Sequence, residues 1–214
     1  MSHFCVYVFH DKGTSIDTLL APYDENITMK PYIKYTRQQL IDKVRMEIEK
    51  YKNTTYAEYL ANPAEFKTKY SYNEIFIKFV EEEFPKQLNW TDEECYESEA
   101  KWYREDGMVD ADGNMLSTCN PKSKWDWYVI GGRWSGNILG RNEIVFDSSI
   151  KTDEIDTPYA FITPDGEWHE KGEMGWWGLA SNEKEEDDWE KEFKEYLNSV
   201  SNSNLVVTCV DCHI

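Results

Sequence analysis

The residues best able to bind or react lie in the stretch 120–136, where aromatic rings alternate with cations. Aromatic faces can stack on a nucleobase, and an arginine fork matches the geometry of a phosphate group. Two adjacent glycines in the same stretch allow the backbone to approach another group closely. The stretch predicts either an anion pocket or a structural centre of the fold. Its candidate ligand-binding residues are Trp125, Trp127, Arg133 and Trp134, with Glu173 as a neighbouring carboxylate.

Two interpretations of Arg133 stay open. In the first, its guanidinium holds a small anionic ligand such as a signalling nucleotide, for binding or for hydrolysis. In the second, which we favour, the tryptophans belong to the core and Arg133 forms a buried ion pair with Glu173 or Asp126. Neither of the common glycine-rich spacings that build a phosphate loop occurs in the sequence.

The C-terminal run 209–213 is the second candidate for chemistry, because it reads Cys-Val-Asp-Cys-His. The letters match the pattern for covalent haem attachment, but β-branched residues precede them and indicate a strand. Alternate side chains of a strand point to opposite faces. Cys209, Asp211 and His213 should therefore share one face, with Cys212 on the other.

Asp211 and His213 could join His10 or His3 from the first strand in a small acid–base or metal site, since adjacent strands bring such groups together. The alternative, which we favour, is an ordinary terminal strand, because no complete set of metal ligands is visible in the sequence. The sequence therefore predicts no catalytic residue, no metal and no cofactor.

Acidic residues gather in two segments. Residues 91–112 contain nine acidic and two basic residues, residues 183–195 contain eight acidic residues and three lysines, and the stretch 120–141 has four basic residues and one acidic residue. Carboxylates along a helix could imitate nucleic-acid phosphates, which lie about 3.4 Å apart along each strand. The candidate binding residues are Glu93, Glu94 and Glu97 in the first segment and Glu185, Glu186 and Asp187 in the second.

The chain has 214 residues, 41 of them acidic and 23 basic, for a formal net charge of −18. Its length favours a single domain, 1–214. The negative charge opposes direct binding to nucleic acid or to an anionic membrane and favours a partner with a basic surface. No apolar run could span a bilayer and no signal peptide is recognisable, which predicts a cytoplasmic protein. Five cysteines, an odd number, predict thiols rather than a disulfide framework.

The order of predicted elements indicates an α+β fold. Residues 4–9 form an almost continuous apolar run, typical of a central strand buried on both faces. Further strands are predicted at 125–130, 143–146 and 205–210, and a hairpin with a Pro-Asp-Gly turn at 159–169. We expect a mixed or antiparallel sheet with the N- and C-terminal strands near one another in the core.

Residues 36–105 predict an inserted set of short helices. Thr36, Thr55, Ser71 and Thr91 are each followed three residues later by Gln or Glu, the pattern of a capping box. The segment 10–35 shows no sustained periodicity and is expected to be a structured loop. Residues 110–114 lack the glycine and glutamate positions of a calcium loop and predict a hairpin turn. The ranges 120–180 and 182–198 are expected to form an aromatic-rich half of the sheet and an acidic helix.

Five segments, 1–4, 20–26, 120–134, 172–178 and 210–214, resemble an uncharacterised family of bacteriophage and prophage proteins. They include the opening Met-Ser-His-Phe, the block Asn-Pro-Lys-Ser-Lys-Trp-Asp-Trp-Tyr followed by Ile-Gly-Gly-Arg-Trp, the block Gly-Glu-Met-Gly-Trp-Trp-Gly and the ending Val-Asp-Cys-His-Ile. The resemblance implies a viral origin and an accessory role in a bacterial cytoplasm. It brings no established activity with it.

Charge and resemblance together predict a phage accessory protein that inhibits a bacterial defence system of the CRISPR or restriction type. Its acidic helices would bind a basic, nucleic-acid-binding surface of a host defence protein. The sequence favours this binding role over an enzymatic one. The alternative is a protein that binds or hydrolyses a small anionic ligand at Arg133 and the neighbouring tryptophans.

Overall fold

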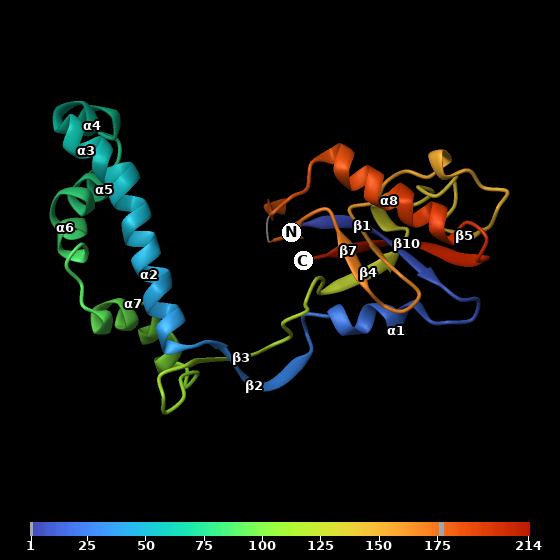
Figure 1. Cartoon of the computed structure of the whole chain (residues 1–214), viewed down its shortest axis with the longest axis horizontal. Coiled ribbons are helices and arrows are strands. Elements are labelled where there is room, and N and C mark those ends of the chain that lie inside the picture. Colours follow the sequence, from blue (N-terminus) through green and yellow to red (C-terminus); the bar gives the residue numbers. More distant parts are fainter. Residues whose placement is uncertain (1, 176–177) are drawn as a thin grey trace. The chain divides into compact units, whose positions relative to one another are not determined.

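The computed structural model describes residues 2–175 and 178–214, which form an α+β fold with a mixed sheet and several short helices (Figure 1). The chain divides into two compact units, one formed by 1–28 with 119–214 and the other by 29–118. The inserted helices of the sequence analysis all lie in the second unit. None of the helices in the described residues is long and apolar enough to cross a membrane.

A six-stranded sheet is the centre of the first unit. Its strand order is β4, β10, β1, β6, β7, and β5 pairs with another part of β10. The pairing of β1 with β6 is parallel and the other pairings are antiparallel. The strands are β1 (His3–His10), β4 (Trp127–Ile130), β5 (Glu143–Phe146), β6 (Ala160–Ile162), β7 (Trp168–Glu170) and β10 (Leu205–His213). The expected central first strand, flanked by the last strand, is confirmed.

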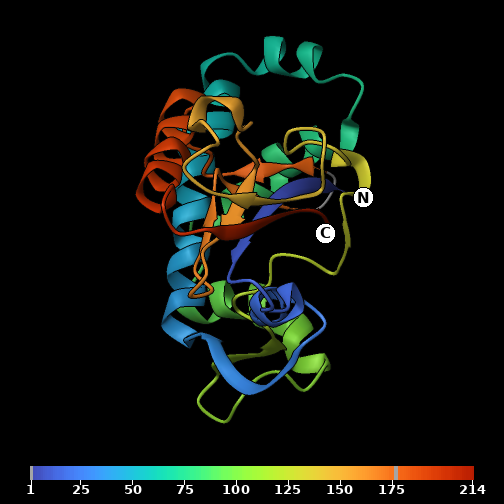
Figure 2. The ribbon, with the colours of Figure 1, turned by 90° about the vertical axis from the view of Figure 1, so that its right-hand side faces the viewer.

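Each face of the sheet packs against a different helix. Tyr7, Phe9 and Phe161 point to the face covered by α8 (Glu186–Val200), which contributes Trp189 and Phe193. In both views α8 lies across this face (Figures 1 and 2). The alternate residues of β1 point to the other face, towards the short helix α1 (Ile16–Leu20).

The segment 10–35 is more regular than expected. Besides α1, it contains the 3-10 turn η1 (Ala21–Tyr23) and the strand β2 (Thr28–Tyr35), which pairs with β3 (Met115–Cys119). The prediction of a loop was wrong because α1 is too short to show helical periodicity. It is instead fixed by a local cap, since the Ser15 hydroxyl accepts a hydrogen bond from the backbone N–H of Asp17.

The second unit is built on two helices, α2 (Arg37–Tyr51) and α7 (Asp92–Glu105), which pack through a core that includes Leu40, Val44, Cys95, Tyr96 and Ala100. Between them the chain forms a series of short helical segments. These are η2 (Lys52–Tyr56), α3 (Ala57–Ala61), α4 (Pro63–Lys69), α5 (Glu74–Lys78), η3 (Phe79–Glu83) and α6 (Phe84–Gln87).

Two of the four predicted capping boxes are present. Thr36 with Gln39 begins α2, and Thr91 with Glu94 begins α7. Thr55 does not begin a helix, because η2 continues the chain from α2 as a wider π-type turn. Asn73 replaces Ser71 as the cap of α5, since its side chain accepts the N–H of Phe76. Asparagine is as good a cap as serine.

Shorter elements complete the first unit: the 3-10 turns η4 (Gly132–Trp134) and η5 (Thr152–Glu154) and the paired strands β8 (Glu173–Met174) and β9 (Ala180–Ser181). The Pro-Asp-Gly hairpin between β6 and β7 is confirmed. The block 172–178, a second cluster of glycines and tryptophans, was expected to pack against the aromatic stretch 120–136, but its Trp176 and Trp177 lie outside the described residues.

Candidate functional site

Three strands bring distant parts of the sequence together at one end of the sheet. His3 in β1 pairs with His213 in β10, which in turn pairs with Trp127 in β4. Asp211 lies two residues before His213 and shares its face, as the alternation along a strand predicted. We call His3, Asp126, Asp211 and His213 the His–Asp cluster.

The cluster consists of two aspartate–histidine pairs. His3 Nδ1 lies 2.9 Å from Asp211 Oδ1, and His213 Nδ1 lies 2.6 Å from Asp126 Oδ1. The two imidazole centroids are 5.0 Å apart. Because a carboxylate accepts a hydrogen bond from Nδ1, each ring is held in one orientation. Nε2 of His213 is buried and has no hydrogen-bond partner among the described residues.

Asp211 is the buried centre of the cluster, with an exposed fraction of 2%. Its second carboxylate oxygen, Oδ2, accepts the backbone N–H of Arg133 at 2.9 Å. This approach depends on Gly132, whose φ is +52°. A Cβ atom there would lie only 2.4 Å from Asp211 Oδ2. The glycine pair that the sequence suggested for close approach therefore approaches a carboxylate of the protein itself.

The Trp127 ring covers the cluster. It stacks on the His213 ring at a centroid distance of 4.8 Å and an interplanar angle of 15°. It also meets the edge of the His3 ring at 5.3 Å. Trp127 itself remains 44% exposed, so one face of the indole is open to solvent. An indole face of this kind shields the imidazole pair from water.

His10 does not belong to the cluster. It lies at the opposite end of β1, opposite Val206. Its Nε2 lies 3.0 Å from the Thr208 hydroxyl and its Nδ1 lies 3.1 Å from the carbonyl of Asp11. Of the two histidines considered from the sequence, the antiparallel register of the terminal strands therefore selects His3.

The predicted pocket of three tryptophans is not assembled. Trp125 is buried on the α1 face, where its Nε1 donates to the carbonyl of Leu20 at 3.1 Å. Trp127 lies on the opposite face, over His213. Trp134 packs against the α8-side core. The sequence predicted a strand from residue 125, which would have placed both rings on one face, but β4 begins at Trp127 and Trp125 lies before it, bridged to Asp24.

The expected ion pair of Arg133 is also absent from the described residues. Its side chain is exposed, and it is the backbone N–H that enters the cluster. Asp126, one of the two expected partners, binds His213 instead. Glu173, the other, is exposed in β8. The role of Asp126 beside His213 could not be anticipated from its position in the chain.

The C-terminal cysteines are separated as expected. Cys209 points to the α8 face and Cys212 to the α1 face, which rules out a shared attachment of haem. No disulfide bond joins the cysteines of the described chain. Within residues 2–175 and 178–214, no three His, Cys, Asp or Glu side chains come together in a way that could hold a metal ion.

The three candidate carboxylates of α7 are all engaged within the second unit. Glu93 forms an ion pair with Arg37, and Glu97 forms two hydrogen bonds with Arg104, at 2.7 and 2.8 Å. The guanidinium of Arg104 lowers the pKa of Glu97. Glu94 serves the capping box, where the N–H and hydroxyl of Thr91 lower its pKa. The first predicted acidic surface is therefore largely neutralised by arginines of the same unit, Arg37 and Arg104.

The acidic end of α8 is different. Glu186 pairs with Lys171 at 2.5 Å. The carboxylates on either side of it are exposed and form no ion pair within the described chain: Glu185, Asp187, Asp188 and Glu190. Acidic residues in the first turn also stabilise a helix through its dipole. Two of the three predicted α8 residues, Glu185 and Asp187, therefore remain available to a partner.

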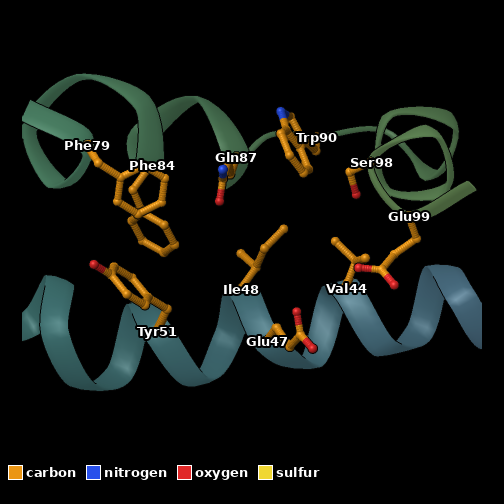
Figure 3. Close-up of a pocket in the computed structure, with 10 residues that line it drawn as sticks. All are labelled: Val44, Glu47, Ile48, Tyr51, Phe79, Phe84, Gln87, Trp90, Ser98 and Glu99. Atoms are coloured by element: carbon orange, nitrogen blue, oxygen red, sulfur yellow. The ribbon is translucent and has the colours of Figure 1, made fainter. Parts of the chain in front are cut away.

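The second unit contains a partly open cavity of about 270 Å³ between α2 and the segment from η3 to α7 (Figure 3). Ile48 points into it from α2, facing Trp90. At one end Tyr51 packs on Phe84 with ring centroids 4.6 Å apart. These side chains extend the core between the helices, and we assign the cavity to that core.

No protein-family model, no curated protein and no solved structure matches the chain. Its function is therefore inferred from the chemistry of the described residues.

Replacing the α7 cap gives a test of this local structure. Thr91→Ala removes the acceptor of the Glu94 N–H, and we expect it to lower the free energy of unfolding by about 1 kcal/mol. The pKa of Glu94 is lowered by the backbone N–H of Thr91 and, second, by its hydroxyl, which both donate to the carboxylate, and the substitution removes the hydroxyl. The contribution of that hydroxyl is present above the ordinary pKa of a glutamate and is lost as the pH falls through the lowered value. Urea denaturation at neutral and acid pH measures both effects. Thr68→Ala, in the exposed end of α4, is the control, and an equal loss in both variants would contradict the assignment.

Proposed function

We propose that the protein is a bacteriophage accessory protein that works in the bacterial cytoplasm by binding and inhibiting a host defence complex of the CRISPR or restriction type. It binds through the acidic N-terminal half of α8, against basic residues that the target uses for nucleic acid. The observation that carries the proposal is the group of exposed carboxylates without an ion pair in the described chain: Glu185, Asp187, Asp188 and Glu190.

The distribution of charge between the two units supports this surface. The first unit carries 23 acidic and 10 basic residues, a net charge of −13. The second unit carries 18 acidic and 13 basic residues, a net charge of −5. A field of one sign raises the rate of encounter with a partner of the opposite sign. The excess of negative charge therefore belongs to the unit that contains α8.

The packing of α8 also supports a binding role. Trp189, Phe193 and Leu197 are buried against the sheet, and Trp189 Nε1 donates to the carbonyl of Pro158 at 2.8 Å. A helix anchored in this way presents its exposed carboxylates in a fixed arrangement. Little conformational entropy is then lost when a partner binds them.

Two sets of charge-neutralising substitutions test the proposal. The α8 set is Glu185→Gln, Asp187→Asn, Asp188→Asn and Glu190→Gln, and the control set on α7 is Asp92→Asn, Glu93→Gln, Glu97→Gln and Glu99→Gln. Both sets remove four negative charges, but the α7 carboxylates are already paired with Arg45, Arg37, Arg104 and Lys43. We expect the α8 set to reduce inhibition about tenfold or more and the α7 set to leave it almost unchanged.

Inhibition is measured as the plating of a targeted phage on hosts that carry one defence system and express each variant. The affinity of the wild-type protein for the inhibited defence protein should also fall steeply as the salt concentration rises. The affinity of the α8 set should depend less on the salt concentration. Equal inhibition by the wild type and by the α8 set, with both folded, would rule out α8 as the binding surface.

A further inference from the structure

A cavity of about 390 Å³ opens beside the His–Asp cluster, within the first unit. His3 belongs to both, because it pairs with Asp211 and also lines the cavity. The described residues that line it include no lysine and no arginine: His3, Phe4, Cys5, Trp134, Asn137, Asp156, Thr157, Tyr159 and Met174.

Several hydrogen-bond donors of this lining are already used inside the protein. The Asp211 carboxylate can only accept, so His3 Nδ1 carries the proton between them, at 2.9 Å. In the neutral ring Nε2 is then an acceptor. The Asn137 amide donates one of its two N–H groups from Nδ2 to the Tyr7 hydroxyl at 2.8 Å, and its carbonyl oxygen is free to accept.

Tyr159 and Asp156 continue this pattern, whereas the Thr157 hydroxyl can donate or accept. The Tyr159 hydroxyl donates to the carbonyl of Gly172 at 2.9 Å, so its proton is also engaged. Asp156 is exposed and its carboxylate forms no ion pair within the described chain. The cavity therefore offers a ligand mainly hydrogen-bond acceptors, one of them negatively charged.

The walls of the cavity are aromatic. Phe4 and Tyr159 meet edge to face with centroids 5.7 Å apart, and the Trp134 indole forms another wall. The faces of such rings carry negative charge density and attract cations. An anion would meet Asp156 without a compensating cation and would enter a unit with a net charge of −13. Aromatic walls and free acceptors together favour a planar cation rich in donors.

We infer that the cavity beside His3 is a binding site for a guanidinium group. A guanidinium is planar, presents five N–H donors and stacks on aromatic rings, whereas an ammonium is a compact point charge that is more strongly hydrated. The group comes either from a free small molecule or from an arginine side chain of a partner. The inference rests on the cavity alone and does not depend on the binding surface proposed for α8.

Calorimetric titration of the full-length protein tests the inference with four probes. These are methylguanidinium, N-acetylarginine amide, the uncharged isostere N-acetylcitrulline amide and a short arginine-containing peptide. We expect the arginine derivative to bind about tenfold or more tightly than the citrulline derivative, since a charged donor group is replaced by a neutral one. Similar affinities for methylguanidinium and the peptide indicate a small-molecule ligand, and a much tighter peptide indicates an arginine of a partner.

A substitution at the rim places the ligand in the cavity. Asp156→Asn should weaken guanidinium binding about tenfold or more. Asp153→Asn removes the same charge from a nearby exposed residue outside the lining and should have little effect. Circular dichroism confirms that both variants are folded. Equal binding of the arginine and citrulline probes, no binding of any guanidinium, or unchanged binding in Asp156→Asn would overturn the inference, as would competition at this site by a nucleotide phosphate.

Discussion

Gly132→Ala should lower the free energy of unfolding by about 3 kcal/mol, combining the cost of a left-handed backbone with that of overpacking. At a φ of +52° an alanine is strained by itself. The new Cβ would also lie 2.4 Å from both Cβ and Oδ2 of Asp211. Asp211 cannot move away freely, because one oxygen accepts the N–H of Arg133 and the other pairs with His3.

Gly140→Ala is the matched control. Gly140 has a φ of +78°, so alanine is strained there too, but a Cβ atom would meet nothing within 4 Å. Its expected cost is about 1 kcal/mol. Urea denaturation of both variants isolates the contact with Asp211. If the two substitutions lower the free energy of unfolding equally, Gly132 does not approach the Asp211 carboxylate as closely as the structure shows.

Asp211→Ala is expected to cost about 3–5 kcal/mol, because two donors lose a buried acceptor at about 1–3 kcal/mol each and a cavity is left. The substitution leaves the N–H of Arg133 and the Nδ1 proton of His3 without their acceptor in a buried place. Each such loss carries the desolvation cost of an unsatisfied group. The cavity left by the removed carboxylate further lowers the free energy of unfolding.

The second aspartate of the cluster provides the comparison. The Asp126 side chain is 26% exposed, so water can replace it when Asp126→Ala leaves His213 without its partner. We expect this variant to lose about 1–2 kcal/mol. Hydrogen exchange of the Arg133 amide separates the two pairs, because it should accelerate in Asp211→Ala and stay slow in Asp126→Ala. Equal stability losses, or an unchanged Arg133 amide in Asp211→Ala, would contradict the structure.

Most of the sheet could be predicted because its strands carry strong local patterns. The apolar run of β1, the β-branched run of β10 and the Pro-Asp-Gly turn between β6 and β7 each specify their own conformation. The capping boxes at Thr36 and Thr91 were equally local. Elements without such a pattern, above all α1, were missed, because they are fixed by a cap and by tertiary packing.

The site was only partly predictable. Strand alternation correctly placed Asp211 and His213 on one face, but the choice between His3 and His10 depends on the register of two strands that lie at opposite ends of the sequence. Trp125 and Trp127 lie on opposite faces because β4 begins only at Trp127, a strand boundary that the residue pattern did not reveal. Three of the α7 carboxylates, Asp92, Glu93 and Glu99, pair with cations of α2, and no pattern within α7 reveals those pairs.

The chain leaves the first unit and returns to it at nearly the same point. Asp24 forms a β-bridge with Trp125, and the N–H of Glu25 donates to the carbonyl of Trp125 at 2.8 Å. The segment between these hydrogen-bonded positions is therefore an insertion that can be removed or replaced as one piece, and we call it a cassette. Excising residues 29–118 and closing the gap with a tight turn should leave the sheet and its His–Asp cluster intact, and cassettes of other lengths could be exchanged at this junction.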